Sequence, residues 1–233
     1  MYSERRLFNS FVSVICFLSS AALTTGCASS RLVYAAEQGN VEKVRSLLYD
    51  GVDVDATERG RTALLFAAQN GRTETVQLLL ERGANVNHRC DGITALHLAA
   101  EKGHAEVARI LLAAGADPTI RMNAFGSLPI HQACFMGHIP AAMVLLSECD
   151  CLNVQNDVGF TPLIMSTFYR RQALARRLLK RGAEMNVRDN HQWTALHHAC
   201  YRWSPPLIRA MLEHEADPAL ETKDGLTPLH LAA

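Results

Sequence analysis

Apolar residues recur along the chain in short segments that have the spacing of amphipathic helices. Val76, Leu79 and Leu80 stand at positions i, i+3 and i+4, and the same spacing returns at 107–111. This spacing places apolar side chains on one face of a helix. The pattern therefore predicts a series of short helices, each with one face directed toward a shared core.

A second, longer periodicity organises these segments. The sequence TALHLAA begins at residue 94, and related sequences begin at 62, 128, 161, 194 and 227, which is a spacing of 32 to 34 residues. Such a period is typical of solenoids, in which a unit cannot bury its apolar face alone and stacks on its neighbours. A degenerate copy at 35–39 precedes the others, so we expect seven units in one domain.

The unit resembles the ankyrin repeat. In the third unit the positions that agree are Gly92, Thr94, Leu96, His97, Ala99, Ala100, Gly103, His104, Ile110, Leu111, Leu112, Gly115, Ala116 and Asp117. The resemblance covers about residues 30 to 233. It implies an all-α ankyrin-repeat solenoid of paired antiparallel helices joined by hairpin loops. We assign it to residues 27–233, with the last unit ending inside its first helix.

Individual positions of the unit have physical roles that favour this fold. Thr94 can cap the first helix, the paired alanines that follow allow close packing, and Gly103 can adopt a positive φ where the helix ends. Pro140 and Pro205 fall where second helices begin, a position that proline suits. At positions 170 and 203, arginine and tryptophan replace the helix-ending glycine.

The first 26 residues have the pattern of a signal peptide. Two arginines precede an apolar stretch over 7–23, and Gly26 and Cys27 follow. The stretch is shorter and more polar than a membrane-spanning helix. Cys27 resembles the acylated cysteine of a bacterial lipoprotein, and Ala28 after it resembles proteins sorted to the outer membrane, facing the periplasm. The alternative is an ordinary secretory peptide in which Cys27 is incidental.

The composition and the absence of known motifs exclude several classes of function. Lys plus Arg and Asp plus Glu both number 23, so the chain has no net positive charge to attract nucleic acid. We expect no metal, cofactor, small-molecule substrate or enzymatic activity, because no catalytic or metal-binding motif is present. Six of the ten histidines fall at fixed repeat positions, which favours a structural role.

The cysteines leave one alternative open. Cys134 and Cys200 replace a small core alanine, and we expect them to be buried. Cys149 and Cys151 lie in a loop and are too close in sequence to bridge easily. An array that carries redox chemistry on Cys90, Cys149, Cys151 or its histidines is the competing function class.

The resemblance implies a protein partner that binds to the concave face and the hairpin tips. At these positions units four to six carry large apolar and aromatic residues, where units two and three carry polar ones. The expected partner-binding residues are Phe125, Phe135, Met136, Phe160, Phe168, Tyr169, Trp193, Tyr201 and Arg202. Exposed aromatic patches mark interaction sites. The alternative is that Phe168, Tyr169 and Trp203 fold into the core.

These observations predict a protein–protein interaction module, anchored by lipid and facing the periplasm. A secreted adaptor directed at host proteins, without acylation, is a further alternative.

Overall fold

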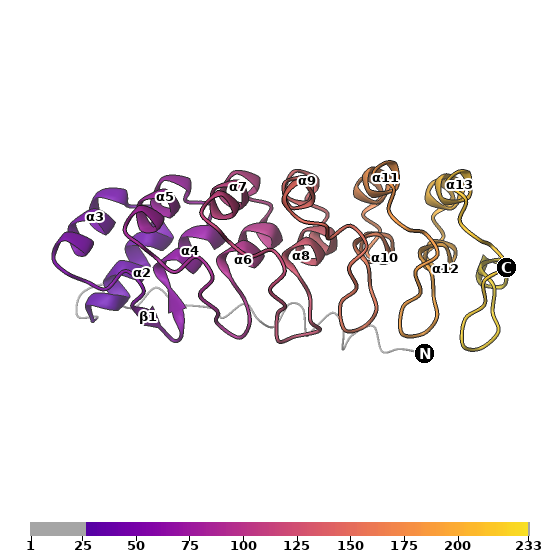
Figure 1. Cartoon of the computed structure of the whole chain (residues 1–233), viewed down its shortest axis with the longest axis horizontal. Coiled ribbons are helices and arrows are strands. Elements are labelled where there is room, and N and C mark those ends of the chain that lie inside the picture. Colours follow the sequence, from indigo (N-terminus) through magenta and orange to yellow (C-terminus); the bar gives the residue numbers. More distant parts are fainter. Residues whose placement is uncertain (1–26, 233) are drawn as a thin grey trace.

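The computed structural model describes residues 27–232 and shows a solenoid of stacked helix pairs (Figure 1). The pairs, here called units one to six, are α2 (Ala28–Gln38) with α3 (Val41–Tyr49), α4 (Ala63–Gln69) with α5 (Thr73–Glu81), α6 (Ala95–Lys102) with α7 (Ala105–Ala113), α8 (Pro129–Met136) with α9 (Ile139–Glu148), α10 (Pro162–Phe168) with α11 (Gln172–Lys180), and α12 (Ala195–Tyr201) with α13 (Pro205–Glu213). Helix α14 (Pro228–Ala232) begins unit seven. The predicted all-α solenoid is confirmed, whereas the proposed signal peptide, 1–26, lies outside the described residues.

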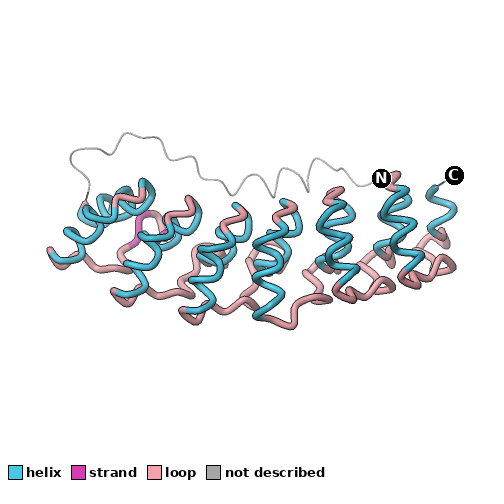
Figure 2. Tube along the Cα trace, turned by 90° about the horizontal axis from the view of Figure 1, so that it is seen from above, coloured by secondary structure: helices cyan, strands magenta, loops and turns pink. Residues whose placement is uncertain are grey.

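The helices form two rows. The first helices of the units form an inner row beside the hairpin loops: α2, α4, α6, α8, α10 and α12. The second helices form an outer row: α3, α5, α7, α9, α11 and α13 (Figure 1). From above, successive pairs stand side by side with the loops along one edge (Figure 2). Within the described residues, no helix has the length and apolarity needed to cross a membrane.

The core runs along the whole stack between the two rows. The paired small residues of the inner helices, Ala67 and Ala68, Ala99 and Ala100, are fully buried. Cys134 and Cys200 take the same place in their units and are buried, as expected. Leu111 of the outer row is fully buried too, so the register assigned from the sequence is confirmed.

Threonine caps and histidines fix the start of the inner helices. The Thr94 hydroxyl accepts the backbone N–H of His97, and Nδ1 of His97 accepts the N–H of Thr94. Nε2 of the same ring donates to the carbonyl of Ser127 in the next hairpin, at 3.2 Å. Burial lowers the pKa of His97 to about 4. This histidine therefore acts as a neutral structural brace between units.

A second set of hydrogen bonds ties the outer helices α5, α7 and α11 to the preceding units. His104 Nε2 donates to the carbonyl of Gln69 at 3.1 Å, and Nε of Arg72 and Arg171 make the equivalent bonds to Glu37 and Phe135. The ring of His138 lies so close to Gly103 that a Cβ there would meet it at 2.6 Å. Glycine is thus required at this helix end both by its φ of 77° and by the neighbouring side chain.

The hairpins of units five, six and seven are each held by one side chain at the base. Asn156 and Asp189 each accept two backbone N–H groups of their own loop through Oδ1, and Thr222 does so through Oγ1. These three residues are 33 positions apart, one per unit. In unit two the hairpin forms a short antiparallel pair of β1 (Thr57–Glu58) and β2 (Arg61–Thr62).

Two details differ from the sequence prediction. Cys149 and Cys151, which we expected not to bridge, are joined by a disulfide across one intervening residue. The chain turns sharply after α9, and this brings the two Cα atoms to 5.3 Å, within the range that a disulfide spans. Arg170 and Trp203 take positive φ values of 58° and 49°, so they keep the helix-ending conformation of the glycine they replace.

Candidate functional site: an aromatic cluster on units four to six

The inner helices and hairpins of units four to six bring aromatic rings from three units into contact. Phe135 of α8 meets Tyr169 with ring centroids 4.5 Å apart, edge to face, and Tyr169 meets Phe168 at 4.9 Å. Phe168 then packs on Phe160 of its hairpin at 5.4 Å. These edge-to-face and tilted arrangements are favoured by aromatic quadrupoles. The rings therefore form a continuous chain from unit four to unit five.

His198 of α12 extends this chain into unit six. Its imidazole lies 5.4 Å from the rings of both Phe160 and Phe168, and 5.0 Å from the ring of Trp193 in the hairpin before α12. Trp193 in turn packs against Tyr201 at 5.5 Å. We call this connected set of rings the aromatic cluster. Its members are Phe135, Phe160, Phe168, Tyr169, Trp193, His198 and Tyr201.

A cation covers part of the cluster. The guanidinium carbon of Arg202 lies 4.3 Å above the ring of Phe168 and 5.6 Å from the ring of Tyr201. Both distances fall in the range of cation–π attraction. Burial raises the pKa of the Tyr169 phenol to about 12, so this side chain is neutral at physiological pH.

Beneath the rings lies a buried polar pair. His198 Nε2 is 2.9 Å from Oδ2 of Asp189, and both side chains are almost wholly enclosed. Desolvation lowers the pKa of His198, and the Asp189 carboxylate opposes this. Nδ1 of His198 is buried without a hydrogen-bond partner in the described part of the chain. The pair links α12 to the base of its hairpin and thereby positions Trp193.

The residues expected to bind a partner differ in how much of each side chain is exposed. Tyr201 is 50% exposed, and its neighbour Trp203 is 69% exposed. Phe135, expected on the surface, is only 8% exposed and belongs to the core. The correction has a physical reason: Tyr169 of the next unit stacks against its ring and covers it.

The remaining expected residues are partly exposed. They are Phe125, Met136, Phe160, Phe168, Tyr169, Trp193 and Arg202. The alternative of inward folding therefore holds in part for Phe168 and Tyr169, and it is wrong for Trp203. Met136 packs against the hydrophobic core from the end of α8, and Phe125 lies in the hairpin before that helix. Their role in binding stays a prediction.

Two residues of this site, Asp189 and His198, were not expected from the sequence. Asp189 lies at the base of the hairpin and His198 lies on α12, and only the fold brings these two side chains together. A signal existed for His198, since Leu98 and Met165 occupy its position in other units and a titratable group there is unusual. Trp203, which the sequence marked as a substitute for glycine and as a candidate for inward folding, is 69% exposed and has a positive φ of 49°.

Other chemistry is sparse. Among residues 27–232, no three His, Cys, Asp or Glu side chains converge as a metal site would require. Cys27 is exposed at the start of α2, and hydrogen bonds with Ser29 lower the pKa of its thiol.

Comparison with known proteins agrees with the repeat architecture. A family model described as ankyrin repeats (3 copies) matches residues 32–122 and 120–189, and a second, ankyrin repeats (many copies), matches residues 178–232.

Individual relatives match over shorter stretches. The chain is 32% identical to the human B-cell lymphoma 3 protein over 120 residues, which are 48% of this chain and 26% of the relative. It is 30% identical to the ankyrin repeat protein nuc-2 of Neurospora crassa over 114 residues, 48% of this chain and 11% of that protein. The rat ankyrin repeat and SAM domain-containing protein 6 is 33% identical over 81 residues, 34% of this chain and 9% of the relative. The matched part is thus about a quarter or less of each relative. Because the two family models together cover nearly all the described residues, the chain belongs to the ankyrin-repeat family.

Proposed function

We propose that this protein is an interaction module that docks a protein partner on units four to six. Ankyrin repeats support a protein–protein interaction role in general, and the aromatic cluster is the surface that we propose for it. The carrying observation is the exposure of Tyr201 and Trp203 beside rings that are already packed in place. Large aromatic side chains on a rigid surface lose little entropy on binding and are frequent energetic centres of interfaces.

The neighbouring contacts support this choice. Trp193 packs against Tyr201, and the Arg202 guanidinium lies near the rings of both Tyr201 and Phe168. A partner would therefore meet a surface whose rotamers are largely fixed before binding. Pre-organisation of this kind reduces the entropic cost of association. The partly exposed Phe160, Phe168 and Tyr169 extend the apolar surface toward unit five.

The test is a double change, Tyr201→Ala with Trp203→Ala. Truncation of central aromatic anchors costs about 2 kcal/mol or more of binding energy. We expect partners recovered by crosslinking and mass spectrometry from the intact protein to be lost with this variant. The thermal unfolding transition should change little, because both side chains are at least half exposed.

A matched control exists in unit three. Glu101 and Lys102 occupy the positions of Tyr201 and Arg202, and they form an ion pair with each other at 2.8 Å. Changing both to alanine should leave partner recovery intact. Loss of binding in this control alone would place the ligand on units two and three and contradict the proposal. Tyr169→Ala is a poorer probe, because its ring packs on buried Phe135 and its loss would disturb the core.

We further propose that Cys27 is the lipid-attachment residue of an envelope protein that faces the periplasm. The support is the charged and apolar pattern of residues 1–26 together with the exposed Cys27 thiol. Two or more acyl chains suffice for stable anchoring. Cys27→Ser should abolish incorporation of a labelled fatty acid and leave the precursor unprocessed. Normal processing with release of a soluble protein would identify an ordinary secretory peptide instead.

A further inference from the structure

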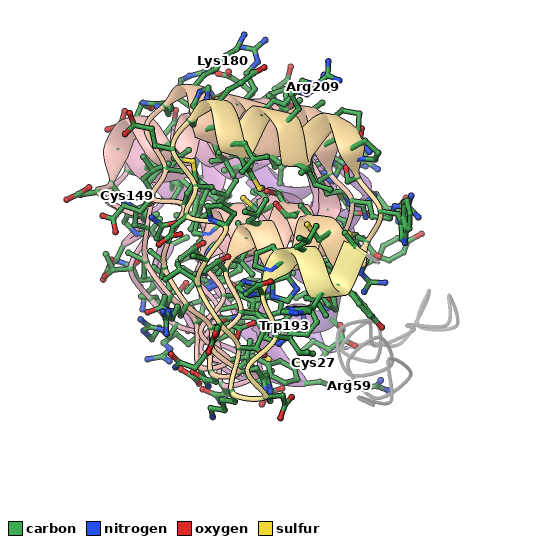
Figure 3. All side chains as sticks on the ribbon, turned by 90° about the vertical axis from the view of Figure 1, so that its right-hand side faces the viewer. Cys27, Arg59, Cys149, Lys180, Trp193 and Arg209 are labelled. Carbon is green, nitrogen blue, oxygen red and sulfur yellow. A yellow bond between two sulfur atoms is a disulfide. The ribbon has the colours of Figure 1, made fainter. Side chains whose placement is uncertain are left out.

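Cationic residues concentrate on the outer row at units five and six. Between residues 158 and 183 the chain has six arginines and lysines and no aspartate or glutamate, although the whole chain has 23 of each kind. Arg176, Arg177 and Lys180 are exposed on α11, and Arg209 is exposed on the neighbouring helix α13. Figure 3 shows Lys180 and Arg209 together at the edge of the molecule far from Trp193. The outer surface here is therefore separate from the aromatic cluster.

In units five and six, the arginine of the outer helix lacks a glutamate that other units place three residues earlier. Arg45, Arg109, Arg176 and Arg209 occupy one repeat position of the outer helices. Three residues earlier, the units containing Arg45 and Arg109 have glutamate, and Glu106 forms an ion pair with Arg109. Units five and six have alanine and proline there instead.

Within residues 27–232, no ion pair or hydrogen bond of the side chains of Arg176, Lys180 or Arg209 is recorded. Their charges are available to a ligand.

These three cations line a groove between α11 and α13. The groove has a volume of about 450 Å³, and its apolar part is formed by Leu179, Ala210 and the first-turn prolines of α13. Glu213 and His214 also line the groove. An apolar floor with a cationic rim complements a segment that carries apolar side chains on one side and carboxylates on the other.

We propose that this groove, formed by Arg176, Leu179, Lys180, Arg209 and Ala210, binds an acidic amphipathic segment of a partner protein. Carboxylates would pair with the three cations while an apolar side chain enters between the helices. A lipid surface is less favoured, because a groove between two helices offers its apolar floor to a narrow segment and not to a plane. This site is additional to the aromatic cluster.

The probe is a fluorescein-labelled peptide of about twelve residues, with glutamates on one face of a helix and leucines on the other. We expect the full chain to raise its anisotropy, and a peptide with glutamine in place of glutamate to bind at least tenfold more weakly. The double change Arg176→Glu, Arg209→Glu should weaken binding of the acidic peptide at least tenfold. Added salt should weaken it too, since exposed charges are screened over about 8 Å at physiological ionic strength.

Arg45→Glu is the matched control, because it makes the same charge change at the same repeat position outside the groove. This control should alter the affinity for the acidic peptide less than twofold. Tyr201→Ala should also leave that affinity unchanged, and this result would separate the groove from the aromatic cluster. Should charge reversal unfold the chain, Arg176→Gln with Arg209→Gln gives the same comparison. Equal binding by all variants would overturn the proposal. So would binding of phosphatidylglycerol vesicles, lost on charge reversal, without binding of the peptide.

Discussion

Three imidazoles, those of His97, His131 and His197, bond to their own unit through Nδ1 and to the next unit through Nε2. In each, Nδ1 accepts the N–H of the residue at the helix N-cap. Nε2 lies 3.0 to 3.2 Å from a carbonyl of the following hairpin. The ring must be neutral to do both, because protonated imidazole has no lone pair left to accept a bond. The chain thus depends on the protonation state of single buried residues.

This dependence predicts loss of stability in mild acid. Burial lowers the pKa of His97 and of His131 to about 4, below the value of about 6.5 expected in an unfolded chain. Above pH 6.5 both states are neutral and the stability is complete. As the pH falls from about 6.5 to about 4, the unfolded chain takes up protons that the folded chain does not, so the free energy of unfolding decreases.

Urea denaturation at pH 7.5 and pH 4.5 measures the effect. Each histidine should contribute a loss of up to about 3 kcal/mol. Other groups titrate in this range as well, so the comparison needs His131→Gln, which cannot take up a proton. This variant should be less stable at pH 7.5 but should lose less on acidification than the unaltered chain. An identical loss in both would show that His131 does not govern the response.

At the scale of elements, the hairpins of units five, six and seven are each built around one acceptor side chain. Asp189 is the most involved of these acceptors, because its Oδ1 holds two backbone N–H groups and its Oδ2 meets His198. Asn156 performs the loop-holding role in unit five with an amide oxygen. The hairpin therefore requires the oxygen, and the charge is needed only for the contact with His198.

Two substitutions separate these roles. Asp189→Ala should destabilise the protein by about 1 to 3 kcal/mol, because buried donors are left without an acceptor. Asp189→Asn should be clearly milder, since the carbonyl oxygen can replace Oδ1 as it does at Asn156. Thermal unfolding followed by circular dichroism would rank the two. If asparagine were as harmful as alanine, the pair with His198, and not the loop, would be the main contribution of Asp189.

At the scale of the whole molecule, the period of 32 to 34 residues determines most of the architecture. The caps, the buried alanines and the apolar faces of the outer helices follow from their repeat positions, and each could be predicted because every unit has nearly the same neighbours. The site could be predicted only in part. Burial of Phe135 by Tyr169, the pair of Asp189 and His198, and the Cys149–Cys151 disulfide depend on side chains that differ from unit to unit, which a repeat pattern does not specify.

Stability in such a stack should be distributed along it, because each unit contacts only its neighbours. One repeat position of the outer row tests this directly. It is occupied by large apolar residues that are at most 2% exposed: Leu47, Leu79, Leu111, Leu145, Leu178 and Met211.

Replacement of a buried leucine by alanine costs about 2 to 5 kcal/mol. We therefore expect Leu79→Ala, Leu111→Ala, Leu145→Ala and Leu178→Ala to fall in this range when each is measured singly by urea denaturation. Leu212→Ala, at a position 47% exposed on the outer row, is the control and should change the stability by no more than about 0.5 kcal/mol. A large effect at one unit with negligible effects at the other three would instead locate the stability in a single nucleus. Comparable losses in all four units would mean that each interface between units carries its own share, so that a ligand on units four to six would stabilise mainly the interfaces it touches.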